Sequence, residues 1–365
     1  MSIEKLHTAA FLQQSKEAII IDVRSPGEYN HAHIPGAVNI PLFTDEERKV
    51  VGTTYKQASR KDAIKIGLDY FGPKMKRIVE EVEQLISDRQ SATGKDDKYL
   101  LIHCWRGGMR SGAVAWLLNL YGFKVYTLAG GYKSYRNHVL QTFEQHFQFK
   151  ILGGFTGSGK TEMLKQLEKE GETIIDLETI ASHKGSAFGN INMPLQPSQE
   201  MFENLLSNQL IAAKEKAERS NRCLPFRGTG GIWLEDESQR IGHVNLPPAF
   251  WNTMRSSPIY FLEVPFEQRL QHLTEEYSLC DKERLLSAID RISKRLGGLD
   301  AKQAKEALLQ NDFTACFRIL LRYYDKQYLK GLHNRENLPA LLQMIKADFV
   351  TIENTNLLLA KHQTV

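Results

Sequence analysis

The stretch HCWRGGMRSG, residues 103–112, is the strongest indication of how the first half of the chain folds. It follows the apolar run YLLIHC at 99–104, which predicts a buried strand, and it precedes a helical pattern over 112–121. A loop at such a strand-to-helix turn directs backbone N–H groups toward a centre near the helix N-terminus. Gly107 and Gly108 allow the positive φ angles that a cradle of this kind requires.

Cys104 lies at the start of this loop, and Arg106 and Arg110 add positive charge beside it. Such surroundings lower the pKa of a thiol and favour the nucleophilic thiolate. The same donors would stabilise the terminal S⁻ or Se⁻ of a persulfide or perselenide. A buried cysteine beside an ordinary glycine turn is the plainer alternative. The combined pattern favours catalysis, with Cys104, Arg106 and Arg110 as catalytic residues and Gly107 and Gly108 as backbone donors.

A second loop, GFTGSGKT at 154–161, fits the pattern G-x-x-x-x-G-K-[ST]. It follows the apolar strand FKILG at 149–153 and precedes a helix over 162–170, which is the context that gives the pattern meaning. Backbone N–H groups of such a loop wrap a phosphate, and the lysine reaches its outer oxygens. The predicted phosphate-binding residues are Gly154, Thr156, Gly157, Ser158, Gly159, Lys160 and Thr161.

A phosphate loop of this type commonly holds Mg²⁺ through its last hydroxyl and a carboxylate that ends a later strand. We therefore expect a magnesium site made of Thr161, Asp176 and Asp236. Glu235 and Glu237 flank Asp236, so the choice among these three acids stays open at this point. Solvated surface acids are an equally good explanation for two of the three.

Strands alternate with helices twice along the chain, which predicts an α/β protein with two parallel sheets. The alternation restarts near residue 148, so we expect one domain over 1–147 and a second over 148–365. The second should become helical from about Phe266 onward. Thr44–Leu68 predicts a single helix. The predicted strands are 18–23, 99–104, 124–128, 149–153, 173–177, 231–234 and 258–264.

The composition excludes several classes of protein. The 365 residues carry a net charge of only +4, which neither indicates nor excludes a nucleic-acid partner. Four cysteines without close pairing are too few for a disulfide scaffold and predict reduced thiols. No apolar run approaches the roughly 20 residues of a membrane span, and the N-terminus lacks the pattern of a signal peptide. We expect a cytoplasmic protein without membrane contact.

The cysteine loop is accompanied by two further stretches, IDVRSPGEY at 21–29 and HIPGAVNIPL at 33–42. Together the three resemble the rhodanese family, in which the loop cysteine carries a sulfane sulfur. The resemblance implies a rhodanese-like parallel-sheet domain at the N-terminus. It also implies that Asp22 and Arg24 are largely structural. The phosphate loop and the second strand–helix alternation predict that a P-loop NTPase-like α/β domain with a helical C-terminal part follows the rhodanese-like domain.

The whole chain resembles the tRNA 2-selenouridine synthase family. The stretches that carry this resemblance are CWRGGMRSG (104–112), LAGGYKSYR (128–136), GGFTGSGKTE (153–162), DLETIASHKGSAFG (176–189), WLEDESQRIG (233–242) and YFLEVPFEQR (260–269). The resemblance implies action on 2-thiouridine at the wobble position, in the anticodon stem-loop of tRNA. The sulfur would first be alkylated with geranyl diphosphate and then replaced by selenium from selenophosphate. Cys104 would carry the selenium as a selanylcysteine.

Two questions about ligands stay open. The phosphate loop is expected to bind the diphosphate of geranyl diphosphate with Mg²⁺, but ATP or GTP would also suit it. The tRNA is expected on basic helices such as 291–298 and 317–330, which mix Lys and Arg with tyrosines. No tightly bound organic cofactor is expected, and we expect a monomer. The alternatives are a rhodanese-type sulfurtransferase fused to a kinase-like NTPase without an RNA substrate, and a nucleotide-regulated binding protein with an inert rhodanese domain.

Overall fold

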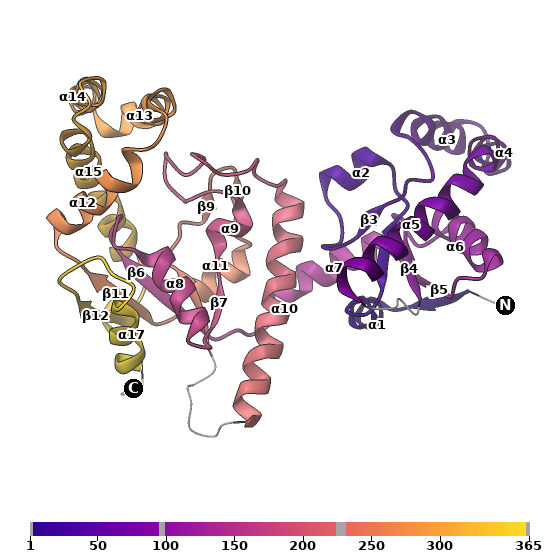
Figure 1. Ribbon diagram of the computed structural model, residues 1–365, viewed down its shortest axis with the longest axis horizontal. Helices are drawn as coiled ribbons and strands as arrows, with labels where there is room; N and C mark the ends of the chain where they lie inside the picture. The colour runs from indigo at the N-terminus through magenta and orange to yellow at the C-terminus, as the bar shows by residue number, and fades with distance from the viewer. Residues whose placement is uncertain (1–2, 95–98, 224–230, 363–365) are drawn as a thin grey trace. The chain divides into compact units, whose positions relative to one another are not determined.

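The computed structural model describes residues 3–94, 99–223 and 231–362, without the side chains of 217–223 and 361–362, so the Cys223 thiol lies outside the described part. Contacts within the chain divide it into an N-terminal unit, Met1–Gln141, and a C-terminal unit, Thr142–Val365. Each unit has a five-stranded parallel sheet (Figure 1). Within the described ranges, no helix is both long and apolar enough to cross a membrane.

The sheet of the N-terminal unit has the order β1-β5-β4-β2-β3, and every neighbouring pair is parallel. Its strands are β1 (Glu4–Leu6), β2 (Ile19–Asp22), β3 (Val38–Asn39), β4 (Leu100–His103) and β5 (Val125–Leu128). All residues of β2 and β4 are buried, as expected for apolar strands that are covered on both faces. Because β4 is the central strand, the loop that follows it lies at the middle of the sheet's carboxyl edge, where α/β proteins commonly bind ligands.

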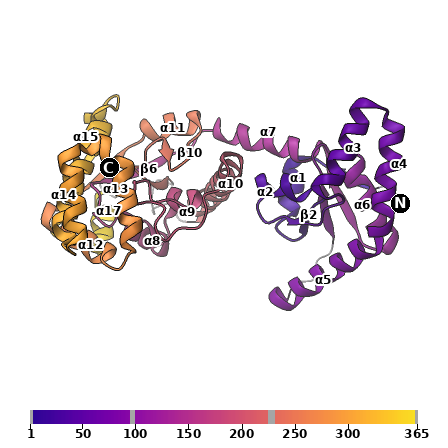
Figure 2. The same cartoon turned by 90° about the horizontal axis from the view of Figure 1, so that it is seen from above.

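The helices of this unit are α1 (Thr8–Gln14), α2 (Pro26–His31), α3 (Asp45–Gln57), α4 (Arg60–Phe71), the short 3₁₀ turn η1 (Gly72–Lys74), α5 (Met75–Thr93), α6 (Met109–Tyr121) and α7 (Gly131–Phe143), which runs through the division between the units. The single helix expected over Thr44–Leu68 is wrong. Ala58 leaves the helical conformation at φ −112° and ψ −90°, and the Ser59 hydroxyl caps a new helix. The two resulting helices, α3 and α4, lie side by side (Figure 2).

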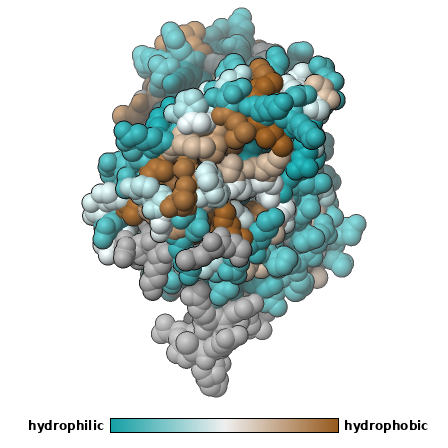
Figure 3. Space-filling model, turned by 90° about the vertical axis from the view of Figure 1, so that its right-hand side faces the viewer, coloured by the Kyte–Doolittle hydropathy of each residue, from teal (hydrophilic) through white to brown (hydrophobic). Residues whose placement is uncertain are grey.

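The core of this unit joins the central strands to α5 and α6, and Cys104 is part of it. Some apolar side chains also reach the surface, among them Leu68, Trp116 and Leu120. Figure 3 shows a face of the molecule on which hydrophobic groups interrupt a largely hydrophilic surface in several places. Scattered exposed apolar groups are normal for folded proteins, so this face alone indicates no partner.

The sheet of the C-terminal unit has the order β12-β11-β6-β8-β7 and is again parallel throughout. Its strands are β6 (Phe149–Gly154), β7 (Thr173–Ile175), β8 (Ile232–Glu235), β11 (Ile259–Glu263) and β12 (Leu342–Lys346). A separate hairpin pairs β9 (Arg240–Ile241) with β10 (Val244–Asn245). The strand β12 corrects the expectation of a mostly helical chain after Phe266. The central strand β6 leads into the phosphate loop.

The helices of the C-terminal unit are α8 (Lys160–Lys169), α9 (Leu177–Ala181), α10 (Gln199–Cys223), α11 (Pro248–Arg255), α12 (Phe266–Tyr277), α13 (Lys282–Leu296), α14 (Gly298–Leu309), α15 (Phe313–His333), α16 (Leu338–Leu341) and α17 (Asn354–His362). Helices α12 to α15 share an apolar core, to which Phe188 and Ile191 also contribute, and they form a helical cluster (Figures 1 and 2). The fold class expected from the sequence is therefore confirmed, including the helical part.

Candidate active sites

Cys104 follows the central strand β4 and is 3% exposed. Its Sγ lies 3.2 Å from the Ser111 hydroxyl. Burial alone would raise the pKa of the Cys104 thiol, but the Ser111 hydroxyl, the Arg110 charge and the backbone N–H groups of Ser111 and Gly108 outweigh it, so the pKa is lowered. This environment favours the thiolate, which is the nucleophilic form of cysteine.

The loop closes tightly around this thiol. Gly107 has φ +61°, and a Cβ there would lie 2.3 Å from the Leu128 carbonyl oxygen, so glycine is required. Gly108 differs from the expectation because its φ is −108°, and a Cβ there would meet no atom within 4 Å. The contribution of Gly108 is instead its backbone N–H, which faces the sulfur.

The turn Gly130–Gly131 and the residues that follow it hold the cysteine loop in place through backbone contacts. The N–H groups of Tyr132 and Lys133, at the start of α7, donate to the carbonyl oxygens of Cys104 and Trp105 at 2.8 and 3.0 Å. Gly131 has φ +62°, and a Cβ there would lie 2.3 Å from the Gly107 nitrogen. The stretch LAGGYKSYR thus shapes the cysteine loop through its backbone.

The two predicted catalytic arginines lie in different surroundings. Arg110 donates from its guanidinium to Glu28 Oε2 at 2.7 Å, which fixes a positive charge near the thiol. The Arg106 side chain is exposed. Sequence reasoning missed Ser111, although it lies in the quoted stretch. Its position in the first turn of α6, three residues after Gly108, was the available signal.

A buried ion pair holds the neighbouring strand ends. Arg24 is 1% exposed, binds the carboxylate of Asp22 through Nε and Nη2, and lies with Cζ 3.8 Å from the centre of the Tyr132 ring. His103 is fully buried beside this pair, and burial lowers its pKa to about 4, so it is neutral at pH 7. Asp22 and Arg24 therefore have the structural role that was expected for them.

In the C-terminal unit, β6 ends at Gly154 and α8 begins at Lys160, with the phosphate loop between them. Gly157 and Gly159 have φ angles of +79° and +76°, which are accessible to glycine at little cost. The Lys160 ammonium folds back over the loop and donates to the Gly154 carbonyl at 3.0 Å. Ser158 Oγ is buried and has no hydrogen-bond partner among the described residues. This arrangement suits a loop that binds the oxygens of an anion.

Side chains of the C-terminal helices anchor the loop. Arg269 on α12 donates to the Thr156 carbonyl at 3.1 Å and forms a two-pronged ion pair with Asp325 on α15, at 2.9 and 2.8 Å. The Tyr328 hydroxyl accepts the Gly154 N–H at 3.3 Å and donates to Asp236 Oδ2 at 2.7 Å. Helices distant in sequence thereby fix the loop's conformation.

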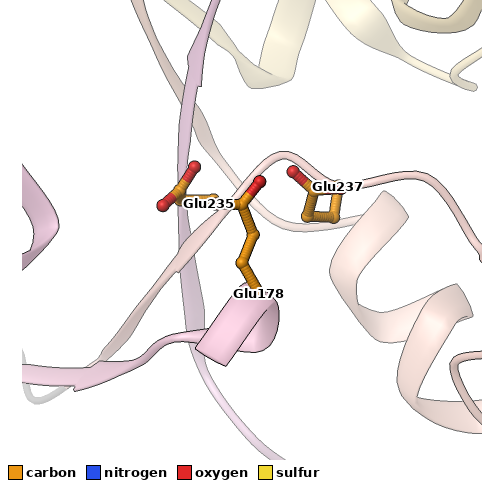
Figure 4. Close-up of side chains that lie close together, drawn as sticks. All are labelled: Glu178, Glu235 and Glu237. Carbon is orange, nitrogen blue, oxygen red and sulfur yellow. The ribbon is translucent and has the colours of Figure 1, made fainter. Parts of the chain in front are cut away.

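Three carboxylates converge beside Lys160: Glu178 on α9, Glu235 at the end of β8, and Glu237 just after it (Figure 4). One oxygen of each lies within 4.8 Å of the others. Burial, together with the neighbouring carboxylates, raises the pKa of all three. The Glu235 carboxylate forms a hydrogen bond with the Thr161 side chain. Its Oε1 atom is buried and has no hydrogen-bond partner among the described residues. A hard divalent cation such as Mg²⁺ fits this set of oxygens.

The two acids predicted as magnesium ligands, Asp236 and Asp176, form hydrogen bonds with other groups of the protein. Asp236 forms an ion pair with Arg335 and accepts from Tyr328. Asp176 caps α9 by accepting the Thr179 N–H at 2.8 Å. We therefore transfer the proposed metal role to their neighbours Glu235 and Glu178, and we retain Thr161. Sequence alone does not reveal which of two successive residues at a strand end faces the loop.

The phosphate loop and the acidic cluster line a cleft of about 1270 Å³ within the C-terminal unit. Its other walls come from α11, α12, α13, α15 and the stretch 183–187. The aromatic residues in these walls are Trp251, Tyr277, Tyr323, Tyr324 and Tyr328. The cationic residues include Lys184, Arg240, Arg255, Arg291 and Arg295. The cleft thus combines a phosphate cradle, a carboxylate cluster and aromatic surface.

Comparisons with known proteins cover both units. Residues 147–347 match the family described as tRNA 2-selenouridine synthase AAA domain, and residues 7–138 match the rhodanese-like domain. Among similar relatives is the tRNA 2-selenouridine synthase of Nitrosomonas europaea, 30% identical over 91% of this chain and 93% of the relative. Proteins of the same name from Shewanella denitrificans and Pseudomonas fluorescens are 35% and 34% identical, each over 85% of this chain and 87% of the relative.

Proposed function

The chain belongs to the tRNA 2-selenouridine synthase family, and from this premise we propose that it exchanges the sulfur of a wobble 2-thiouridine in tRNA for selenium. In the first step the sulfur attacks C1 of geranyl diphosphate, a C–S bond forms, and diphosphate leaves with the electrons of the broken C–O bond. In the second step a selenium nucleophile adds to C2 of the base, and the S-geranyl group leaves as a thiolate. Alkylation is needed because an unmodified thiocarbonyl sulfur is a poor leaving group.

Cys104 is the residue that we propose to carry selenium into the second step as a perselenide. Selenophosphate supplies selenium at the selenide level, so forming the S–Se bond requires a two-electron oxidant of the disulfide class, and phosphate leaves. After the terminal selenium has attacked C2 and the S-geranyl thiolate has left, a small-molecule thiol cleaves the S–Se bond reductively, which releases 2-selenouridine and the Cys104 thiol. The observation that supports this role best is its lowered thiol pKa beside Ser111 and Arg110. The same hydroxyl and N–H groups that favour a thiolate would stabilise a terminal selenium anion on this side chain. The tight loop, closed by Gly107 and Gly131, fixes the position of these donors before substrate arrives.

The phosphate loop is proposed to bind the diphosphate of geranyl diphosphate. Backbone N–H groups of the loop and the Lys160 ammonium would hold its oxygens. A magnesium ion held by Thr161, Glu235 and Glu178 would supply charge neutralisation for the leaving diphosphate. The apolar and aromatic walls nearby, with Leu273, Ile292 and Tyr323, suit a ten-carbon prenyl chain.

The decisive experiment is mass spectrometry of tRNA nucleosides after incubation with the full-length protein. Thiolated tRNA with both geranyl diphosphate and selenophosphate should yield 2-selenouridine. Omission of selenophosphate should leave S-geranyl-2-thiouridine, and omission of geranyl diphosphate should leave 2-thiouridine unchanged. If geranyl diphosphate can be replaced by ATP without loss of selenation, the assignment of the prenyl donor is wrong. Fast turnover of thiosulfate and cyanide with no change in the tRNA would instead identify a sulfurtransferase.

A further inference from the structure

The cleft continues past the phosphate loop to helix α11, where Trp251 and Arg255 line it. Its volume of about 1270 Å³ exceeds the roughly 300–1,000 Å³ that is typical of pockets for a single small ligand. A diphosphate ester bound at the loop therefore leaves room for part of a second molecule. The chemistry of the α11 wall indicates what that molecule is.

Trp251 and Arg255 are one helical turn apart, so they lie on the same face of α11. The Arg255 guanidinium lies 5.5 Å from the centre of the indole and donates to the Gly331 carbonyl at 3.0 Å. Both side chains are half-buried. A half-buried indole that lines the cleft, beside a guanidinium held by a backbone carbonyl, is suited to stack a nucleobase and to contact a phosphate.

Arg255 lies near a second guanidinium, that of Arg335. Arg335 is buried and pairs through one nitrogen with Asp236, and its Nε and Nη1 have no hydrogen-bond partner among the described residues. Burial and the Arg335 charge both lower the pKa of the Arg255 guanidinium. Two guanidinium groups thus lie near the carboxylate of Asp236. An anionic group at Arg255 would offset the repulsion between them.

We propose that Trp251 and Arg255 form a nucleotide subsite, in which the RNA substrate stacks one base on the indole and places one phosphate against the guanidinium. This inference rests on the proposed function and names where in the cleft the RNA is held. The hairpin β9–β10 favours RNA over a free nucleotide. It adds the exposed side chains of Arg240 and His243 to the same cleft, and these suit the successive phosphates of a chain.

The test uses full-length protein and a fluorescent, wobble-thiolated anticodon stem-loop, with the dissociation constant measured by anisotropy over a range of salt concentrations. Trp251→Ala should weaken binding roughly five- to hundredfold, which is the range for loss of one base stack, whereas Trp251→Phe should retain most of the affinity. Arg255→Gln should weaken binding and reduce the salt slope by about one, and Arg255→Lys should keep the slope. Lys169→Gln, an exposed change at the end of α8 outside the cleft lining, is the control.

Loading of Cys104 from selenophosphate without RNA should be unchanged in these variants, and it serves as a check that they are folded. Wild-type affinity and slope in Trp251→Ala and Arg255→Gln, with normal prenylation of tRNA by the wild type, would overturn the subsite and leave the proposed function intact. Loss of ATP or GTP binding with unchanged RNA binding would also overturn it, in favour of a free nucleotide. A wild-type protein that does not modify thiolated tRNA would refute the proposed function itself.

Discussion

Ser111 gives Cys104 a hydrogen-bond donor that can change partners. Its Oγ lies 3.2 Å from the Cys104 sulfur and 3.2 Å from the Gly108 carbonyl oxygen. A hydroxyl has a single proton, so it can donate to only one of them at a time. With a protonated thiol the hydroxyl donates to the carbonyl and accepts from S–H. With a thiolate it turns to the sulfur.

Replacing Ser111 by Ala should raise the pKa of the Cys104 thiol, because the largest stabilising contact of the thiolate is lost. A hydrogen bond to a charged group contributes about 1.5–3 kcal/mol, so alkylation by iodoacetamide at pH 7 should slow by at least about tenfold. The measurement is the rate of Cys104 alkylation against pH, followed by peptide mass spectrometry. Ser134→Ala is the control, because the Ser134 hydroxyl pairs with Thr8 instead. An unshifted pH profile in Ser111→Ala would show that the hydroxyl does not stabilise the thiolate.

Glu235 is the residue on which the proposed magnesium site depends most. Glu235→Gln removes one negative charge next to Thr161 and should weaken Mn²⁺ binding by about tenfold or more, since charge count sets the affinity of carboxylate sites. Isothermal titration calorimetry with the full-length protein measures this. The control Asp176→Asn changes an acid that caps α9 and should retain Mn²⁺ affinity. The reverse result would restore Asp176 as the ligand and exclude Glu235.

Among the secondary-structure elements, the glycine turn before α7 fixes the conformation of the cysteine loop through backbone contacts. Gly131→Ala should destabilise the protein by more than about 2 kcal/mol, because the Cβ would collide with the backbone of Gly107 and Cys104 in addition to the strain of a positive φ. It should also slow Cys104 alkylation. Gly36→Ala is a matched control, since Gly36 has φ +82° but nothing within 4 Å of a Cβ. Its expected cost is only about 1–2 kcal/mol. Equal losses of unfolding free energy in Gly131→Ala and Gly36→Ala, measured by urea denaturation, would contradict the steric argument.

Elements with a strong local signal could be predicted from the sequence. The buried runs at β2, β4 and β6 and both glycine-rich loops were identified because their composition and flanking periodicity agree. The break between α3 and α4 was missed, since Ser59 caps a helix only where the chain turns. The strand β12 was missed because its sequence, LQMIK, gains its hydrogen bonds only from β11.

The candidate sites divide in the same way. Cys104 and the phosphate loop carry their chemistry in contiguous sequence, so they could be found without coordinates. Arg255 and Arg335 come near each other only because α11 packs against the end of α15. A local sequence pattern does not reveal such a tertiary contact. The sequence also could not show that Glu235, and not Asp236, lies beside Thr161 at the proposed metal site. Adjacent residues at a strand end point in opposite directions, and the register with β6 decides which one faces Thr161.

In the molecule as a whole, the two proposed sites belong to different units with separate cores. Lys160→Ala should therefore lower geranylation by about a hundredfold or more and leave Cys104 loading intact. Cys104→Ser should have the opposite effect, so that S-geranyl-2-thiouridine accumulates in tRNA. Nucleoside and protein mass spectrometry of the same reaction measure both quantities. Lys169→Ala, an exposed change at the far end of α8, is the control. A Lys160→Ala protein that geranylates at the normal rate would separate the phosphate loop from prenyl transfer.

The anchoring of the phosphate loop by Tyr328 and Asp325 has a consequence for biosynthesis. The Gly154 N–H meets the Tyr328 hydroxyl across 174 residues of sequence. At about 5–20 residues per second, a ribosome needs roughly 10–35 s to add that stretch. During this interval the nascent loop exists without the side chains that set its shape. Newly made chains should consequently acquire affinity for the proposed diphosphate ligand only once α15 has left the exit tunnel, well after the segment containing Cys104 has been made.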